Sequence, residues 1–141
     1  MGKLTKSIEI EASPEKVFTF INDDKKMNEA GRVKVETTSE GPVGVGTTRH
    51  LVGPKMEWTL EVTEFVKNKK IAQRTIGASK FKMTDLWTLE PTAKGTKLTF
   101  SADYELPYSL LGKVVDKVRV GKLIEKQQSQ TLENMKKALE A

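Results

Sequence analysis

The order of the expected elements constrains the fold most, because a run of strands is followed by one long helix. From Gly31 to Leu106, turn residues interrupt the sequence at short intervals, which is typical of consecutive strands joined by hairpins. From Ser109 to Ala141 there is no proline, and apolar residues recur at helical spacing. A strongly curved antiparallel sheet cannot cover its own concave face, so the late helix is expected to lie there. Any space left between the sheet and the helix would form a pocket.

The first part of the chain predicts one strand and two short helices. Leu4–Glu11 alternates apolar and polar residues, as a half-buried strand does. Ser13 followed by Pro14 is a typical N-cap and first helical position. Residues 22–24, Asn-Asp-Asp, can end this helix and cap a second one that closes near Ala30.

Six further strands are expected, and the short turns between them make the sheet antiparallel. They are Val33–Ser39, Thr47–Val52, Met56–Val66, Ile71–Ile76, Lys80–Glu90 and Thr96–Leu106. A length of 141 residues suits one domain, 1–141. The predicted class is therefore α+β, with a highly curved antiparallel seven-stranded sheet wrapped around a C-terminal helix.

The long helix carries an apolar stripe that should face the sheet. The stripe consists of Leu111, Val114, Val118, Ile124, Leu132, Met135 and Leu139, and it also includes Gly121 and Gln128. Glycine inside a helix costs about 1 kcal/mol relative to alanine. Gly121 therefore indicates either close packing on the sheet or a kink that widens the cavity.

Composition limits the compartment and the partners. Hydrophobic residues make up 37% of the chain, and no segment approaches the roughly 18 continuous apolar residues of a membrane span. We expect no membrane insertion, and the cytoplasm is the default location because the start lacks a secretory signal. With no cysteine there is neither a disulfide framework nor a thiol nucleophile.

The net charge of +5 raises the question of nucleic-acid binding. Acidic residues interleave with the basic ones, however. On the final helix, Lys117, Lys122 and Lys126 share the sequence with Asp116 and Glu125. This mixture predicts a solvated helix face and no specific nucleic-acid partner.

Several phrases along the chain carry a family resemblance. They are Ile-Glu-Ile-Glu-Ala-Ser-Pro-Glu-Lys-Val-Phe at 8–18, Gly-Val-Gly-Thr at 44–47, the segment 58–65, and Trp-Thr-Leu-Glu-Pro at 87–91 followed by Gly-Thr at 95–96. Together with the element order, they resemble the START-like (SRPBCC) superfamily of helix-grip proteins, and most of all its polyketide cyclase/dehydrase and lipid-transport group. The resemblance covers nearly the whole chain and implies a lipophilic ligand in the cavity. It names no catalytic motif, so the fold alone assigns no activity.

Alternation along the strands predicts which side chains face the helix. The expected pocket walls comprise Trp58, Phe81, Met83, Asp85, Trp87, Phe100 and Tyr104 from the sheet, with Val118, Gly121, Ile124 and Gln128 from the helix. In a helix-grip fold the same face is both core and pocket wall, so each of these residues has two possible roles.

Asp85 interrupts an otherwise apolar row. A buried carboxylate needs a partner or a shifted pKa, and the Tyr104 hydroxyl could be that partner if the strands pair in register. The alternative is that a bulge after Phe81 turns Asp85 outward. Gln73 or His50 could add polar orientation to a ligand.

Metal and thiol chemistry have little support in the sequence. His50 is the single histidine, whereas a metal site takes three or four His, Cys or carboxylate ligands. We therefore predict no metal, no cofactor and no assigned catalytic residue, with His50 on the surface or at a pocket rim.

The leading hypothesis is a protein that binds a small hydrophobic or amphipathic ligand, such as a lipid, a quinone or a polyketide-like molecule, as a carrier or sequestering protein. One alternative is an enzyme resembling polyketide cyclases or dehydratases. Another is a protein-interaction module that uses the basic final helix. The expected oligomeric state is a monomer or a weak dimer.

Overall fold

The computed structural model describes residues 2–53, 56–77, 81–105 and 117–141, with side chains in the last segment described from residue 120 onward. The elements run in the order β1 (Gly2–Ile10), α1 (Pro14–Ile21), α2 (Asp24–Ala30), β2 (Lys34–Thr37), β3 (Thr48–Val52), β4 (Glu57–Val66), β5 (Lys70–Ile76), β6 (Lys82–Pro91), β7 (Thr96–Glu105) and α4 (Lys117–Glu140). All seven expected strands are present, and each end lies within two residues of its expected position. The expected helix start at Ser109 lies outside the described residues.

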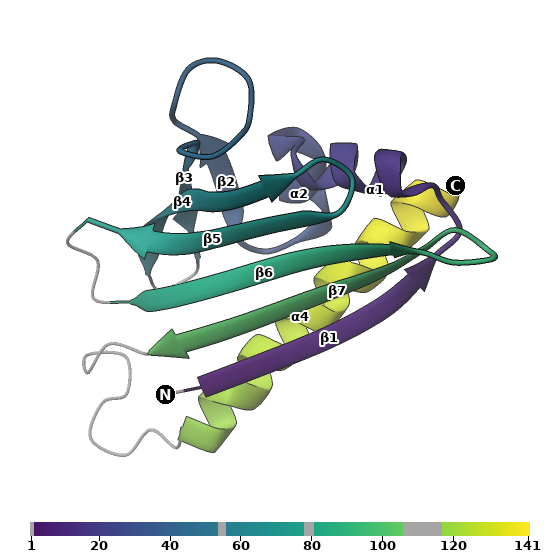
Figure 1. Cartoon of the computed structure of the whole chain (residues 1–141). Coiled ribbons are helices and arrows are strands. Elements are labelled where there is room, and N and C mark those ends of the chain that lie inside the picture. Colours follow the sequence, from purple (N-terminus) through teal and green to yellow (C-terminus); the bar gives the residue numbers. More distant parts are fainter. Residues whose placement is uncertain (1, 54–55, 78–80, 106–116) are drawn as a thin grey trace.

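The strands form one antiparallel sheet in the order β1-β7-β6-β5-β4-β3-β2. Strands β2 to β7 follow one another as hairpins, and β1 completes the sheet by pairing with β7. The sheet curls, and α4 crosses one of its faces, while α1 and α2 lie at one end (Figure 1). The predicted α+β helix-grip class is confirmed.

The caps of the two short helices form as the sequence predicts. The Ser13 side chain accepts a hydrogen bond from the Lys16 backbone N–H at 3.3 Å, and Pro14 occupies the first turn. Asp23 accepts from the Lys26 backbone N–H at 3.1 Å. Each cap satisfies an N–H group that the helix itself leaves unpaired.

The inner face of the sheet consists of the alternating rows that the sequence predicts. On β7 the residues Leu98, Phe100, Ala102 and Tyr104 are all buried, while their neighbours are exposed or half-buried. The same alternation buries the row that includes Trp58 on β4 and the row that includes Asp85 on β6. These rows are the surface on which a ligand or α4 can pack.

Asp85 faces inward and is 7% exposed. The alternative of a bulge after Phe81 is wrong for the strand as described, because β6 pairs without interruption from Lys82 to Pro91 with β7. The sheet's described irregularity falls instead on β4, between Val62 and Glu64.

One end of the interior is fully closed. Ile10, Val17, Leu98 and Met135, here called the closed core, each have 0% exposure. They come from β1, α1, β7 and α4, which meet where the C-terminus lies beside α1 (Figure 1). These four side chains supply packing, because none of them has exposed surface left for a ligand.

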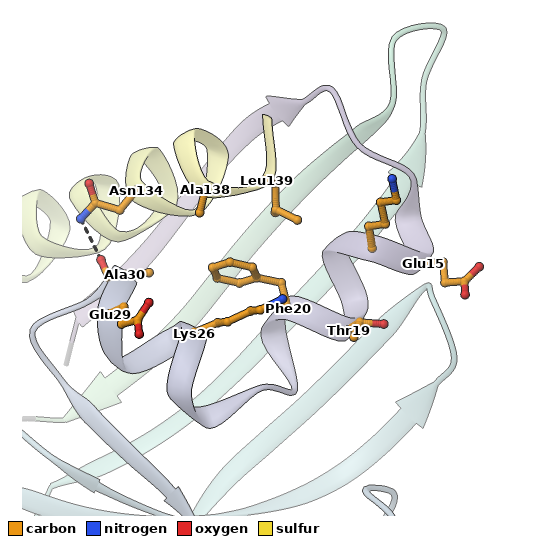
Figure 2. A pocket seen from close by; sticks show the side chains of 10 residues that line it. Glu15, Thr19, Phe20, Lys26, Glu29, Ala30, Asn134, Ala138 and Leu139 are labelled. Carbon is orange, nitrogen blue, oxygen red and sulfur yellow. Dashed lines mark hydrogen bonds between the residues drawn. The ribbon is translucent and has the colours of Figure 1, made fainter. Parts of the chain in front are cut away.

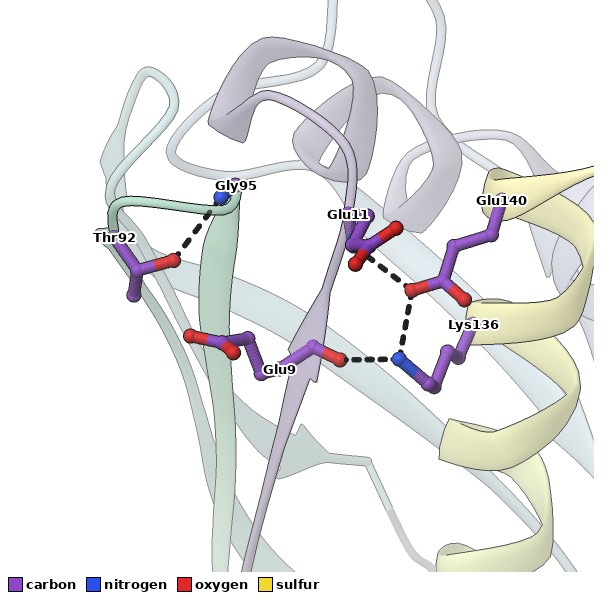
Figure 3. Close-up of polar contacts among 6 residues, drawn as sticks. All are labelled: Glu9, Glu11, Thr92, Gly95, Lys136 and Glu140. Atoms are coloured by element: carbon purple, nitrogen blue, oxygen red, sulfur yellow. Dashed lines mark hydrogen bonds and ion pairs between the residues drawn. The ribbon is translucent and has the colours of Figure 1, made fainter.

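The C-terminal turns of α4 are tied to the end of β1 by what we call the edge clamp, formed by Lys136 and Glu140. The Lys136 Nζ donates to the Glu9 carbonyl at 2.8 Å, and Glu140 Oε2 accepts from the Glu11 backbone N–H at 2.9 Å. Lys136 and Glu140 also pair with each other at 2.7 Å (Figure 3).

The described part of the α4 stripe packs as expected. Leu132 is 2% exposed, while Ile124 and Leu139 are half-buried. A Cβ added at Gly121 would lie 3.3 Å from the Tyr104 hydroxyl, which favours close packing as the reason for this glycine. Leu111 and Val114 lie outside the described residues, as does the side chain of Val118.

Candidate functional site

A chain of polar side chains crosses the buried inner face of the sheet. Arg49 Nη1 donates to Gln73 Oε1 at 3.3 Å, and Gln73 Nε2 donates to Asp85 Oδ1 at 2.9 Å. At the other end, Arg49 Nη2 donates to Asn22 Oδ1 at 2.7 Å. These four residues are the buried polar cluster, and all of them except the half-buried Asn22 are at most 7% exposed.

Strand register and one helix end bring the cluster together. Gln73 and Asp85 are directly paired across β5 and β6. Arg49 lies on β3, on the other side of β4 from Gln73, so its long side chain spans β4. Asn22 is the C-cap of α1, and its Nδ2 also donates to the Phe18 carbonyl at 2.9 Å. The cluster therefore links the end of α1 to three strands of the sheet, β3, β5 and β6.

Burial changes the electrostatics of both charged members. Burial raises the pKa of Asp85 to about 7, while the hydrogen bond from Gln73 and the charge of Arg49 oppose that rise. Burial also lowers the pKa of Arg49, opposed by the carboxylates of Asp24 and Asp85. Asp85 can therefore gain or lose a proton near neutral pH, which is the condition for acid–base chemistry or for a charge-sensitive ligand site.

Two buried N–H donors find no hydrogen-bond partner within the described part of the chain. They are Nε of Arg49 and Nε1 of Trp58. A buried donor that stays unpaired costs free energy comparable to a lost hydrogen bond, so such groups are uncommon in native proteins.

Aromatic side chains surround the cluster on the same face. Trp58 and Phe81 meet edge to face with ring centroids 4.9 Å apart, and Trp87 and Phe100 lie 4.7 Å apart. Phe81 also approaches Tyr104, at 6.5 Å between centroids. The structure thus brings together the sheet residues predicted from the sequence; Met83 is half-buried beside them, as are Gly121, Ile124 and Gln128 on α4.

The expected pairing of Asp85 with Tyr104 does not follow the observed register. Asp85 lies opposite Ala102 on β7, and Tyr104 lies opposite Met83. The partner of Asp85 is Gln73 on the other neighbouring strand. Tyr104 is therefore two residues away from the position opposite Asp85, so the expected contact between the Asp85 carboxyl and the Tyr104 hydroxyl is not part of the observed pairing.

His50 faces away from the buried polar cluster, because Arg49 beside it points inward. Its Nδ1 lies 3.2 Å from Thr59 Oγ1, and its Nε2 lies 3.5 Å from Glu57 Oε2. It is half-exposed, as the surface alternative predicts. Within the described residues, no group of three or more His, Cys, Asp or Glu side chains could hold a metal ion.

A separate groove of about 450 Å³ lies between α1, α2 and the C-terminal turns of α4 (Figure 2). Phe20, Ala138 and Leu139 supply apolar surface, and Lys26 lies over the Phe20 ring at 5.9 Å from its centroid. Asn134 donates to the Ala30 carbonyl at 2.8 Å at one side of the groove. None of the site residues predicted from the sequence lines it.

Sequence reasoning missed Arg49 and Asn22. Arg49 stands on a strand of only five residues, too short for alternation to mark one arginine as buried. Asn22 follows α1 and has the sequence pattern of a helix breaker, although its side chain is also a hydrogen-bonding group. A signal for Arg49 exists in hindsight: it stands in phase with Leu51, whose apolar side chain marks the inward side of the same strand.

The curled seven-stranded sheet, its crossing C-terminal helix and the aromatic inner face with a small polar cluster define a helix-grip protein of the SRPBCC type. The chain belongs to the family described as polyketide cyclase / dehydrase and lipid transport, which matches residues 1–140. No curated protein matches the sequence. Among the residues that the structure describes, no helix is long and apolar enough to span a bilayer.

Solved structures agree on the fold. Protein TTHA0849 from Thermus thermophilus superposes with a TM-score of 0.80 at 18% identity, covering 98% of this chain and 97% of that one. The Aha1 dimer from Colwellia psychrerythraea gives a TM-score of 0.72 at 19% identity, covering 99% and 97%. Protein MLL2253 from Mesorhizobium loti gives 0.74 at 18% identity, covering 96% and 95%. At these identities the similarity shows the fold alone.

Proposed function

We propose that the protein binds a small hydrophobic or amphipathic molecule between the inner face of the sheet and α4, and that it acts as a carrier or sequestering protein. The observation that carries this proposal is an aromatic inner face interrupted by one small, buried polar cluster. Ligand sites are typically apolar with a few placed polar groups, which orient the ligand. The family description, which includes lipid transport, supports the same class of ligand.

The residues assigned to the site divide by role. Trp58, Phe81, Trp87 and Phe100 would contact the apolar part of the ligand, and Arg49, Gln73 and Asp85 would orient its polar part. A lipid, a quinone or a polyketide-like molecule has both parts.

Intrinsic fluorescence provides a direct test, because the chain has two tryptophans and both lie on the inner face. Titration with a lipophilic probe such as ANS should give a saturable change in tryptophan emission. Trp87→Ala should weaken probe binding, whereas Lys97→Gln, on the exposed side of β7, should leave it unchanged. Native mass spectrometry of the protein from its own source should show a co-purifying small molecule. If no probe binds saturably and no molecule co-purifies, the proposal is wrong.

An enzymatic role is the second candidate, favoured by the near-neutral pKa of Asp85 within a hydrogen-bonded cluster. In that case Asp85 would move a proton on a bound polyketide-like substrate. Asp85→Asn keeps the shape and the acceptor oxygen but cannot exchange a proton. Turnover should then fall about a hundredfold or more while affinity changes little.

The oligomeric state follows from a different measurement. The structural relative from Colwellia psychrerythraea is described as a dimer, and we infer a monomer or weak dimer for this chain. Sedimentation analysis across a range of concentrations distinguishes the two states. A dimer that persists at nanomolar concentration would contradict the inference.

A further inference from the structure

The two buried donors without partners in the described residues are close together on the inner face. Arg49 is 5% exposed and Trp58 is 7% exposed, so water has little access to either. Arg49 pairs with Leu60, and Trp58 stands two residues before Leu60 on the same strand. Arg49 and Trp58 are thus diagonal neighbours on one face, a relation that brings long side chains within reach of each other.

Both groups can only donate, which limits what can satisfy them. The guanidinium and the indole have N–H donors and no acceptor. The oxygen of a ligand alcohol has two lone pairs and could accept from both donors, but its own hydroxyl proton would then need a further acceptor. A carboxylate offers two acceptor oxygens on one rigid group, and it binds guanidinium with strong, charge-assisted hydrogen bonds.

The charge of Arg49 points to the same chemistry. Arg49 reaches Asp85 through Gln73 instead of through a direct ion pair. Asp24, the other carboxylate that acts on Arg49, already accepts from the Thr37 N–H at 2.7 Å and from its hydroxyl at 3.0 Å. A buried cation with indirect compensation is stabilised by an anion brought next to it.

Building on the proposed function, we propose that the ligand is an amphiphile with a carboxylate head group, bound by Nε of Arg49 and Nε1 of Trp58. Its apolar tail lies along Phe81, Trp87 and Phe100. The carboxylate satisfies both donors and compensates the guanidinium charge.

Asp85 couples this site to pH. The groups that act on Asp85 are Gln73 on β5 and Arg49 on β3, and Asp24 at the start of α2 acts on Arg49. A ligand anion next to Arg49 weakens the positive field that favours ionised Asp85, so the complex retains the proton on Asp85. Because that proton is harder to hold at high pH, carboxylate binding should weaken as the pH rises, whereas binding of a neutral ligand should not.

The test compares decanoic acid with decanol, which have the same tail and different heads, on the full chain by calorimetry. Decanoate should bind at least about tenfold more tightly than decanol at pH 6.5, and the preference should shrink several-fold by pH 8.5. Arg49→Gln should abolish the preference. Trp58→Phe, which keeps a ring beside Phe81 and removes the N–H, should reduce the preference several-fold. Lys97→Gln removes a charge from the outer face and should leave the preference unchanged.

The outcomes separate this inference from the proposed function. Equal affinity for the acid and the alcohol, or a preference that survives in both variants, overturns the carboxylate site and leaves a lipophilic container. If neither compound binds, the proposed function fails as well. Decanol binding checks that each variant is folded, and Trp58→Phe keeps the inference testable if Arg49→Gln does not fold.

Discussion

The closed core and the buried polar cluster lie in the same interior, yet the first buries only apolar side chains and the second buries polar and charged ones. The closed core consists of Ile10, Val17, Leu98 and Met135, each at 0% exposure. The polar cluster buries an arginine, a glutamine and an aspartate, and it leaves an arginine N–H without a partner in the described residues. The closed core contributes to stability alone. The buried polar cluster carries the free-energy cost of burying charged and unpaired groups, which stability does not require.

This difference indicates that the buried polar cluster, and not the closed core, is the functional region. Replacing buried charged groups with apolar groups of similar volume is often neutral or stabilising, so a buried charge is weak evidence of a structural role. Proteins commonly retain unfavourable groups where activity needs them. Changes in the closed core should therefore lower stability without altering ligand binding, whereas changes in the cluster should alter ligand binding without lowering stability.

The largest expected effect on stability is in the closed core. Met135→Ala truncates a fully buried side chain of α4 and should lower the free energy of unfolding by about 2–5 kcal/mol. Urea denaturation measures this loss, and ANS affinity without denaturant, at a temperature well below the midpoint, should stay unchanged. Leu123→Ala, at a position 54% exposed on the same helix, is the control and should change stability by less than about 0.5 kcal/mol. A loss of ligand affinity in Met135→Ala would mean that the two regions are not separate.

The next effect has the opposite sign and depends on pH. The pKa of Asp85 is raised from 3.8 to about 7 in the folded protein, so the folded state binds the proton more tightly than the unfolded state does. The stability of the native protein should therefore fall as the pH rises between these values, by about 2–3 kcal/mol from pH 5 to pH 8. Asp85→Asn removes this dependence and should raise stability at pH 8 relative to the native protein. A parallel pH dependence in both proteins would show that Asp85 is not the group responsible.

A smaller effect is expected at a buried polar group that belongs to the closed end. Thr96 is 0% exposed, and its hydroxyl donates to the Ala12 carbonyl at 2.7 Å. Thr96→Val keeps the shape, removes the donor and should cost about 1–2 kcal/mol at every pH. Thermal unfolding at pH 5 and pH 8 measures it. If Thr96→Val instead raised the stability, this hydrogen-bonded polar group would behave like Asp85. The contrast between the closed end and the buried polar cluster would then be wrong.

The smallest effect is expected at the edge clamp. The pKa of Glu140 is lowered, first by the hydrogen bond from Lys136 and then by that from the Glu11 N–H. A lowered carboxyl pKa stabilises the fold above the unfolded pKa, and this contribution disappears as the pH falls through the folded value. Glu140→Gln should therefore lower the Tm slightly at pH 7 and low salt, and this loss should shrink as the pH falls and in 1 M salt, since exposed pairs are weak and screened. A large drop in Tm at pH 7 would show that the edge clamp is essential for the stability of the fold.

Much of the fold could be predicted because local signals agree with one another. Ser13 and Pro14 fix the start of α1 through capping, and alternation assigns the inner row of β7 from Leu98 to Tyr104. The hairpin turns then leave few ways to order the strands, and the observed order is the simplest meander with β1 added at one edge.

The candidate site was only partly predictable because it depends on register and reach. The partner of Asp85 is decided by which residues face each other across β5 and β6, and turn residues do not fix that to a single pair. The Arg49 side chain lies in the interior, where it spans β4 and reaches Gln73. The sequence alone does not show that these two side chains come within hydrogen-bond distance. The groove between α1, α2 and α4 depends on how three helices are spaced, which periodicity does not encode.

The position of β1 in the sheet also governs how the molecule can be made. Ser7 and Thr99 touch across β1 and β7 with hydroxyls 2.8 Å apart, although 92 residues separate them along the chain. During synthesis the hairpins from β2 to β7 can form as they emerge, whereas β1, the first of the seven strands made, stays without its neighbour until the other six have been made. Closing a loop of that length costs about 3 kcal/mol more than closing a hairpin turn of a few residues. We therefore expect the pairing of β1 with β7 to be a late and slow step of folding, and until it occurs the unpaired edges of both strands are open to other chains.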